Sequence, residues 1–276
     1  MGMMDGFAAR KAMMMHQKGD YQGAMAGYEA LWQKGYVTCA YLLPYTVLLL
    51  RAGGEENYLK VKEILKKAEK APDVNDEHRQ QIFTNYAVAQ YKLGKLPEAL
   101  HLLEMAHNKN HCGTIYETLG YLYIEKAAQH QLEEIAAPIT PAPQPELTED
   151  AEEGMEESQE PQESAPTVQD DIEKALQYNM EALDYDDEDA VTLDNLGQLY
   201  YRVIGDKEKA KAYFDKAHEI KPGQIDTLYF LAQYDLEAGR RSEAVEKLKK
   251  TLDGRFSPLN YATRSMIEAQ LKELGA

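Results

Sequence analysis

The chain has 276 residues, of which 44% are hydrophobic, and a net charge of −17 at pH 7. The acidic balance argues against binding to nucleic acid or anionic lipid, because both need clustered Lys and Arg. The longest apolar run, the 14 residues from Val37 to Leu50, is shorter than the ~20 residues that span a bilayer. We therefore expect a cytoplasmic protein that neither inserts into a membrane nor binds nucleic acid; an anchor upstream of residue 1 stays open as an alternative.

The first two segments with helical periodicity each predict a pair of helices. In residues 7–35, Ala24 and Tyr28 recur at helical spacing after a turn, and residues 38–70 repeat this arrangement. Pro44 lies within the first helix of the second pair, where it predicts either a kink or a late start of that helix. The chain therefore begins with two helix-turn-helix units.

Residues 76–109 predict a third pair, and residues 113–127 predict the first helix of a fourth. Four potential metal ligands gather in this region: His101, His107, His111 and Cys112. They do not have the spacing of a recognised ligand set. We therefore expect no metal site.

The second helix of the fourth unit does not follow directly. Residues 128–171 contain 13 Asp or Glu and no Lys or Arg, so the rest of the chain carries only −4. The same segment contains six of the 11 prolines and no aromatic residue. Such a composition cannot bury enough apolar surface to offset the entropy lost on ordering. We expect residues 128–171 to be a disordered, acidic, Pro-rich insertion within one unit.

One hypothesis gives this insertion a regulatory role. A flexible acidic segment tethered inside the fold would be present at a high effective concentration near Arg51, Lys92 and Arg202. It could then compete with a ligand for these cations. A plain spacer is the favoured alternative.

The helical pattern resumes at residue 172, and its clearest unit spans residues 189–222. Leu193 and Leu196 recur at helical spacing, and Pro222 follows the end of the second helix. Gly197 lies inside the first helix, where glycine is about 1 kcal/mol less favourable than alanine. We expect this glycine to let the second helix approach closely.

One more pair, within residues 225–252, and a last helix complete the chain. Ile267, Leu271 and Leu274 form one apolar stripe on the last helix. Such a helix is typical of the cap that covers the final unit of a solenoid.

Small residues recur in register through these units. The first helices carry Ala87, Gly120, Gly197 and Ala232; the turns carry Gly19, Gly94, Gly205 and Gly239; the second helices carry Ala24, Ala99, Ala175, Ala210 and Ala244. Ala210 and Ala244 are 34 residues apart. The chain therefore resembles the tetratricopeptide repeat (TPR) family, whose unit is a 34-residue helix-turn-helix. This resemblance implies an all-α fold, a right-handed α-solenoid of about six repeats plus a C-terminal capping helix.

Three segments follow from the resemblance. Residues 1–127 form the N-terminal repeats, about three and a half in number, and residues 128–171 form the acidic insertion. Residues 172–276 form the C-terminal repeats and the capping helix. We expect the first and last segments to make one continuous solenoid.

The resemblance also assigns one face of each first helix to a concave, partner-binding surface, which we call the predicted groove. On this chain it comprises Met13, His16, Val47, Arg51, Val88, Tyr91, Lys92, Tyr121, Glu125, Tyr201, Arg202, Tyr229 and Gln233. Tyrosine offers a large contact area and a hydrogen-bonding tip, which suits a peptide or a helix. For any single tyrosine, packing between repeats is an equally good interpretation.

The sequence contains no catalytic motif, such as a Gly-rich phosphate loop, a nucleophile elbow or a metalloprotease signature. We therefore expect a non-enzymatic scaffold without a cofactor, which holds a peptide or helical segment of a partner protein in the predicted groove. The alternative is a structural assembly subunit that self-associates through the ends or the convex face of the solenoid.

Overall fold

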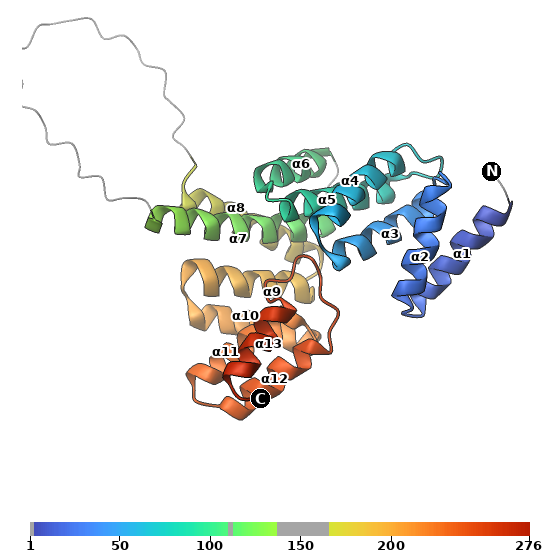
Figure 1. Cartoon of the computed structure of the whole chain (residues 1–276). Helices are drawn as coiled ribbons and strands as arrows, with labels where there is room; N and C mark the ends of the chain where they lie inside the picture. Colours follow the sequence, from blue (N-terminus) through green and yellow to red (C-terminus); the bar gives the residue numbers. More distant parts are fainter. Residues whose placement is uncertain (1–2, 110–112, 137–165) are drawn as a thin grey trace, which may run out of the picture.

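The computed structural model describes residues 3–109, 113–136 and 166–276, and every regular element in these ranges is a helix (Figure 1). The elements in chain order are α1 (Met3–Gln17), α2 (Tyr21–Gln33), α3 (Cys39–Ala52), α4 (Glu55–Ala68), α5 (Asp76–Lys92), α6 (Leu96–Lys109), α7 (Gly113–Ala136), α8 (Val168–Tyr185), α9 (Ala190–Leu199), the π-helical turn η1 (Tyr200–Ile204), α10 (Lys207–Ile220), α11 (Ile225–Glu237), α12 (Arg241–Leu252) and α13 (Arg264–Glu273). Consecutive helices form pairs, and each pair packs against the next. These pairs, followed by α13, confirm the predicted all-α solenoid.

The helices α9 and α10 pack closely because Gly197 has no side chain. A Cβ atom at this position would lie 2.6 Å from the ring of Phe214, which is fully buried. Phe214 in turn stacks on Phe230 of α11, with the ring centroids 5.0 Å apart. The close approach predicted for Gly197 is thus confirmed, and it lets one aromatic ring join two neighbouring pairs.

We expect the substitution Gly197→Ala to lower the free energy of unfolding by about 1–3 kcal/mol, because the added methyl group overlaps a tightly packed ring. Urea denaturation followed by circular dichroism measures this loss. Gly6→Ala in α1 is the matched control, since a Cβ there meets no atom within 4 Å. Equal stability of the two variants would contradict the close approach.

The pair α7–α8 has the same arrangement with a polar partner. A Cβ atom at Gly120 would lie 2.4 Å from the Nδ2 atom of Asn179, which occupies the position that Phe214 has in the next pair. Asn179 is fully buried, and its Nδ2 donates to the carbonyl oxygen of Ala175 at 2.7 Å. Its Oδ1 atom has no donor among the described residues. A buried acceptor without a donor is unfavourable by about 1–3 kcal/mol, so this pair lacks the stabilisation that the aromatic ring gives its neighbour.

The first helix of the following pair contains one extra residue. Eight residues lead from Gly197 to the turn glycine Gly205, whereas seven lead from Ala232 to Gly239 in the next pair. The structure accommodates the extra residue as the π-helical turn η1, after which Gly205 adopts the left-handed conformation with φ 80°. The π turn shifts the register of its side chains, which include two residues of the predicted groove.

Helix α3 begins at Cys39 and runs through Pro44, so the late start that was the alternative to a kink does not occur. Asp73, which precedes the next pair, caps this helix. Its carboxylate accepts hydrogen bonds from the main-chain N–H groups of Cys39 at 2.8 Å and of Ala40 at 3.2 Å. A carboxylate is favourable at this end of a helix, where N–H groups have no helical partner.

The interrupted unit contains more helix than the sequence predicted. Helix α7 continues to Ala136, and α8 begins at Val168, so both ends of the segment 128–171 are helical where we expected disorder. One reason is local: Thr167 and Asp170 form a reciprocal capping box that starts α8. Residues 137–165, with most of the acidic side chains, lie outside the described residues.

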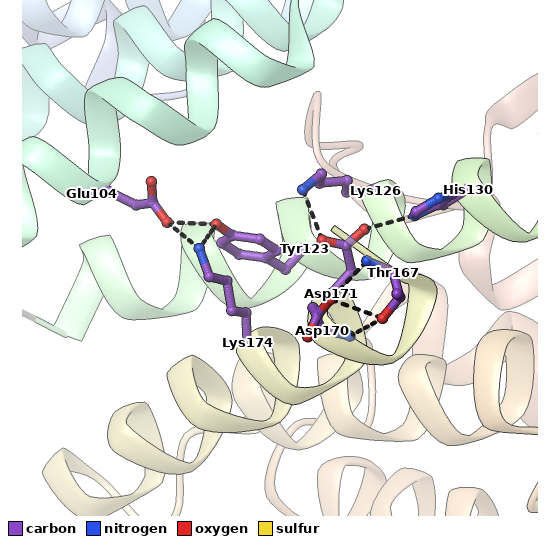
Figure 2. A network of polar contacts seen from close by, with 8 residues as sticks. All are labelled: Glu104, Tyr123, Lys126, His130, Thr167, Asp170, Asp171 and Lys174. Carbon is purple, nitrogen blue, oxygen red and sulfur yellow. Dashed lines mark hydrogen bonds and ion pairs between the residues drawn. The ribbon is translucent and has the colours of Figure 1, made fainter. Parts of the chain in front are cut away.

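A polar network joins α7 to α8 next to this segment (Figure 2). The almost fully buried carboxylate of Asp171 lies 2.7 Å from Lys126 Nζ and 3.3 Å from His130 Nδ1. Lys174 of α8 lies 3.0 Å from Glu104 of α6 and so connects the preceding pair as well. These contacts hold α7 and α8 together although the inserted segment separates them along the chain.

The last helix covers the end of the solenoid. Ile267 and Leu271 of α13 are buried in one apolar cluster with Ala244 and Leu248 of α12 and Ile225 of α11. This packing confirms the predicted capping helix.

Candidate functional site

A cavity of about 630 Å³ lies along the first helices of successive pairs. Side chains of α3, α5, α7 and α9, together with the start of α11, line it. Its volume falls in the ordinary range of ligand sites, about 300–1,000 Å³. We call it the central cavity.

The loop between α12 and α13 completes one wall of the central cavity. We call residues 253–263 the strap; Figure 1 shows it beside α9. Residues 257–260 of the strap line the cavity, as does Arg255. A segment near the C-terminus thus lies against helices of the N-terminal half.

The strap is held at one end by Asp226, a buried residue in the first turn of α11. Its carboxylate accepts hydrogen bonds from Asn260 Nδ2 at 2.9 Å and from the main-chain N–H groups of Tyr261 at 3.1 Å and Ala262 at 2.9 Å. Several hydrogen-bond donors offset the hydration that a carboxylate loses when it is buried. Asp226 therefore fixes the path of the main chain across the inner face.

At its other end the strap reaches the first pair of helices. The guanidinium of Arg255 donates a hydrogen bond to the hydroxyl of Tyr21 in α2 and lies 5.4 Å from the centre of its ring. Leu259 packs against both the N-terminal and the middle apolar clusters of the core. The strap consequently connects the last repeat to the first.

Two buried carboxylates of the cavity accept hydrogen bonds from the protein on both oxygens. Asp194 accepts hydrogen bonds from Thr227 Oγ1 at 2.5 Å and from Gln198 Nε2 at 2.8 Å, and Asp226 accepts three from the strap. Burial, followed by the charge of Asp226, raises the pKa of Asp194. Burial likewise raises the pKa of Asp226, although its donors oppose the change.

Glu117 of α7 is the third carboxylate of the cavity and differs from the other two. No hydrogen bond from the described residues reaches its side chain, and at intermediate burial its carboxylate stays accessible from the cavity. Burial, and then the charges of Asp189 and Asp186, raise its pKa to about 7, although Lys221 opposes them. Glu117 is thus an acceptor without a donor on the wall of the cavity.

Four residues of the predicted groove line the central cavity: Val47, Arg51, Val88 and Tyr121. Val88 and Tyr121 are buried, so only their edges face the cavity, whereas Arg51 is exposed.

Three more residues of the predicted groove bond to one another. The hydroxyl of Tyr91 donates to Glu125 at 2.8 Å, and Arg202 Nη1 lies 2.6 Å from the other oxygen of Glu125. Burial and the charge of Glu125 raise the pKa of Tyr91, which keeps its hydroxyl a donor. The Arg202 guanidinium stacks 4.1 Å from the ring of Tyr261 in the strap, and Lys92 Nζ lies 4.8 Å from the Tyr91 ring. These half-buried side chains therefore contact one another and the strap.

Two residues of the predicted groove belong to the first pair of helices, away from the cavity. Met13 packs against the N-terminal apolar cluster. His16 Nδ1 lies 3.3 Å from the hydroxyl of Tyr28. Both contribute to the packing of this pair.

The remaining three residues of the predicted groove lie toward the C-terminal end. Tyr201 donates to Glu237 at 3.3 Å, and Tyr229 packs 6.0 Å from the ring of Tyr261. Gln233 exchanges hydrogen bonds with Gln270 of the capping helix at 3.2 and 2.8 Å. The structure therefore brings only part of the predicted groove to the central cavity.

Sequence reasoning missed the acidic residues of the cavity. The repeat register carries a signal for two of them, because Glu117 and Asp194 each lie three residues before the small residue of their helix, Gly120 and Gly197 respectively. Nothing comparable points to the strap, whose partners are remote in sequence.

None of the helices in the described ranges is both long and apolar enough to cross a membrane. Within the same ranges, no group of three or more His, Cys, Asp and Glu side chains is placed to hold a metal ion. Of the four potential ligands noted in the sequence, His107 packs edge-on against Tyr178, with the ring centroids 5.5 Å apart, and residues 111 and 112 lie outside the described part of the chain.

The arrangement of helical pairs matches that of solved structures. TTC0263, described as a thermophilic TPR protein in Thermus thermophilus, aligns with a TM-score of 0.50 and 15% identity over 98% of both chains. The 276-residue chain therefore has the TPR fold.

Two further structures share the TPR arrangement. PilW, a type IV pilus biogenesis factor, has a TM-score of 0.55 and 13% identity over 98% of this chain and 100% of PilW. A monomeric mutant of IFIT1 with m7Gppp-AAAA has a TM-score of 0.61 and 13% identity over 97% of this chain and 54% of IFIT1. No family model and no curated protein matches the sequence. At these identities the likeness shows the fold alone.

We expect Glu117→Gln to stabilise the TPR solenoid at high pH. The pKa of Glu117 is about 7 in the folded protein, above its ordinary value of 4.5, so the folded state binds more protons between these values. The free energy of unfolding of the natural protein therefore falls as pH rises from about 4.5 to about 7. The Gln variant lacks this loss and should be about 1–2 kcal/mol more stable than the natural protein near pH 8.

Urea denaturation near pH 5 and near pH 8 measures the difference. An advantage of equal size at both pH values would contradict a raised pKa at Glu117. Glu208→Gln, on the exposed face of α10, is the control and should change stability equally at both.

Proposed function

We propose that this protein is a non-enzymatic interaction scaffold that binds a peptide or helical segment of a partner protein in the central cavity. The strap is the observation that carries the proposal. It is a non-helical stretch of chain that lies on the inner face and bonds Asp226 through the main-chain N–H groups of Tyr261 and Ala262. The inner face thus already holds one such segment, and the cavity beside it has room for another.

The charges on the inner wall of the cavity favour a protein segment over RNA. Glu117, Asp194 and Asp226 line this wall, and carboxylates repel a phosphate backbone, whereas the cations that line the cavity are exposed. The structure of IFIT1 with m7Gppp-AAAA shows that a solenoid of this kind can hold RNA, so RNA is a proper competitor in the test.

The cavity wall does not support an enzyme. Glu117, with its pKa near 7, could act as a general acid or base, because such groups titrate close to the operating pH. Catalysis of this type also needs a nucleophile or a second acid–base group, and the other carboxylates of this wall, Asp194 and Asp226, are buried and already accept hydrogen bonds from α9, α11 and the strap. Glu117 could supply one acid–base group but not the nucleophile or the second acid–base group that the reaction needs.

We expect Val191→Trp to abolish peptide binding. Val191 is exposed in the first turn of α9 and lines the cavity, so an indole there fills the mouth without disturbing the core. Dodecapeptides selected from a random library on the natural protein, with their affinities measured by fluorescence anisotropy, provide the readout. The affinity should fall by at least about tenfold.

Ile220→Trp on α10 is the matched control, because Ile220 is similarly exposed and does not line the cavity. Peptides that bind both variants as tightly as the natural protein would overturn the proposed site. A short RNA that binds more tightly than every selected peptide would overturn the proposed class of partner.

A structural assembly subunit is the second candidate, and one observation favours it. Met4, Phe7 and Met14 form an exposed stripe on α1, with exposed fractions of 84%, 73% and 54%. Such a stripe on the outer helix of a solenoid could pack against a second copy of the chain.

If the stripe mediates self-association, the natural protein forms a dimer and Phe7→Glu converts it to a monomer, because the charge would be buried in the interface. Size-exclusion chromatography with light scattering measures the mass of both. A monomeric natural protein at high concentration rules this candidate out.

A further inference from the structure

Two polar groups on the wall of the central cavity lack hydrogen-bond donors. The first is the carboxylate of Glu117. The second is the side-chain oxygen of Gln224, the residue that precedes α11; its Nε2 donates to the carbonyl oxygen of Ala190 at 3.0 Å, whereas its Oε1 is buried and has no donor among the described residues. Gln224 is only 8% exposed and lines the cavity. A buried acceptor is normally satisfied, so the Gln224 oxygen points to a missing donor, whereas the half-buried carboxylate of Glu117 is open to one from the cavity.

The two acceptors lie in the same part of the cavity. The side chain of Gln224 bonds to Ala190 at the start of α9. The helix cap Asp189, directly before it, is close enough to Glu117 to raise its pKa. Asn195, one turn further along α9, donates to the carbonyl oxygen of Glu117 at 3.2 Å. Residues 189–195, at the start of α9, therefore lie next to both Glu117 and Gln224.

The acidic groups that line the cavity are more buried than the basic groups. The carboxylates of Asp194 and Asp226 are buried and Glu117 is half-buried, whereas the cations that line the cavity are all exposed: Arg51, Lys221 and Arg255. Arg255 is already bonded to Tyr21. Lys221 acts on Glu117 through its charge and makes no hydrogen bond with it among the described contacts. Among the described residues, these cations therefore donate no hydrogen bond to the Glu117 carboxylate or to the Oε1 atom of Gln224.

We propose that the central cavity is a binding site for an arginine side chain of a partner peptide, with Glu117 and the Oε1 atom of Gln224 as its acceptors. The guanidinium carries five N–H donors in a rigid plane and can therefore satisfy two acceptors from different helices at once. An ammonium group offers a compact, strongly hydrated charge, which is less suited to a partly buried site. The inference rests on the proposed function and deepens it by naming the side chain that the peptide inserts.

The charge of Glu117 supports this assignment. Asp189 and Asp186 repel its ionised form, and only Lys221 offsets them. A bound guanidinium adds the missing positive charge and favours the ionised form. Binding therefore becomes tighter as pH rises through about 7, the opposite of the effect of pH on stability.

The test uses N-acetyl-L-arginine amide as the probe and the full chain labelled with ¹⁵N. N-acetyl-L-citrulline amide is the matched control, because it has the same shape without the charge. NMR titration should show saturable shifts of the Gln224 side-chain amide and of the main-chain amides of Glu117 and Val191. The arginine probe should bind at least about tenfold more tightly than the citrulline probe, and Glu117→Gln should remove most of this difference.

Equal binding of the two probes, or saturable shifts confined to other parts of the protein, would overturn the assignment. So would an unchanged preference in Glu117→Gln, with Glu208→Gln as the control for loss of one acidic charge. If Glu117→Gln does not fold, the pH dependence decides, since the natural protein must bind the arginine probe more tightly near pH 8 than near pH 6.

A second readout separates this inference from the proposed function. The selected dodecapeptides are resynthesised with citrulline in place of each arginine. Peptides that depend on Val191 but not on arginine would overturn only the arginine site. Peptides that do not depend on Val191 would overturn the proposed function itself.

Discussion

The structure depends on how closely the two helices of each pair can approach. Where Gly197 faces Phe214, the absence of a Cβ atom lets a whole aromatic ring enter the contact and reach the next pair. Each pair therefore buries its second helix against its first and leaves the inner face of the first helix available. The cavity exists because several such faces lie side by side around it.

The polar groups of the inner face divide into those the chain satisfies itself and those it does not. Asp226 takes its donors from the strap, and Asp194 takes them from Thr227 and Gln198. Glu117 has no donor, and neither does the oxygen of Gln224, among the residues that the structure describes. A desolvated acceptor without a donor is unfavourable. A bound group rich in N–H donors would therefore stabilise this wall of the cavity.

The repeating small residues made the fold predictable, because each one reports a helix–helix contact that is local in sequence. The same locality explains what could not be predicted. The strap reaches Asp226 and Tyr21 through contacts that no periodicity encodes, and its Tyr261 stacks on Arg202, a residue of the predicted groove. Composition likewise failed at the ends of the acidic segment, where a capping box and an ion-paired Asp171 give single carboxylates a structural role.

The bond between Arg255 and Tyr21 also changes how the solenoid should unfold. A repeat array held only by nearest-neighbour contacts can fray from either end, one unit at a time. Here the partners are 234 residues apart in sequence, and the strap between α12 and α13 carries contacts to both the first and the middle parts of the core. The terminal pairs are thereby linked, so loosening one end also removes support from the other. Closing so long a loop slows folding, and the contacts across it add a long-range term to the stability of the two end pairs.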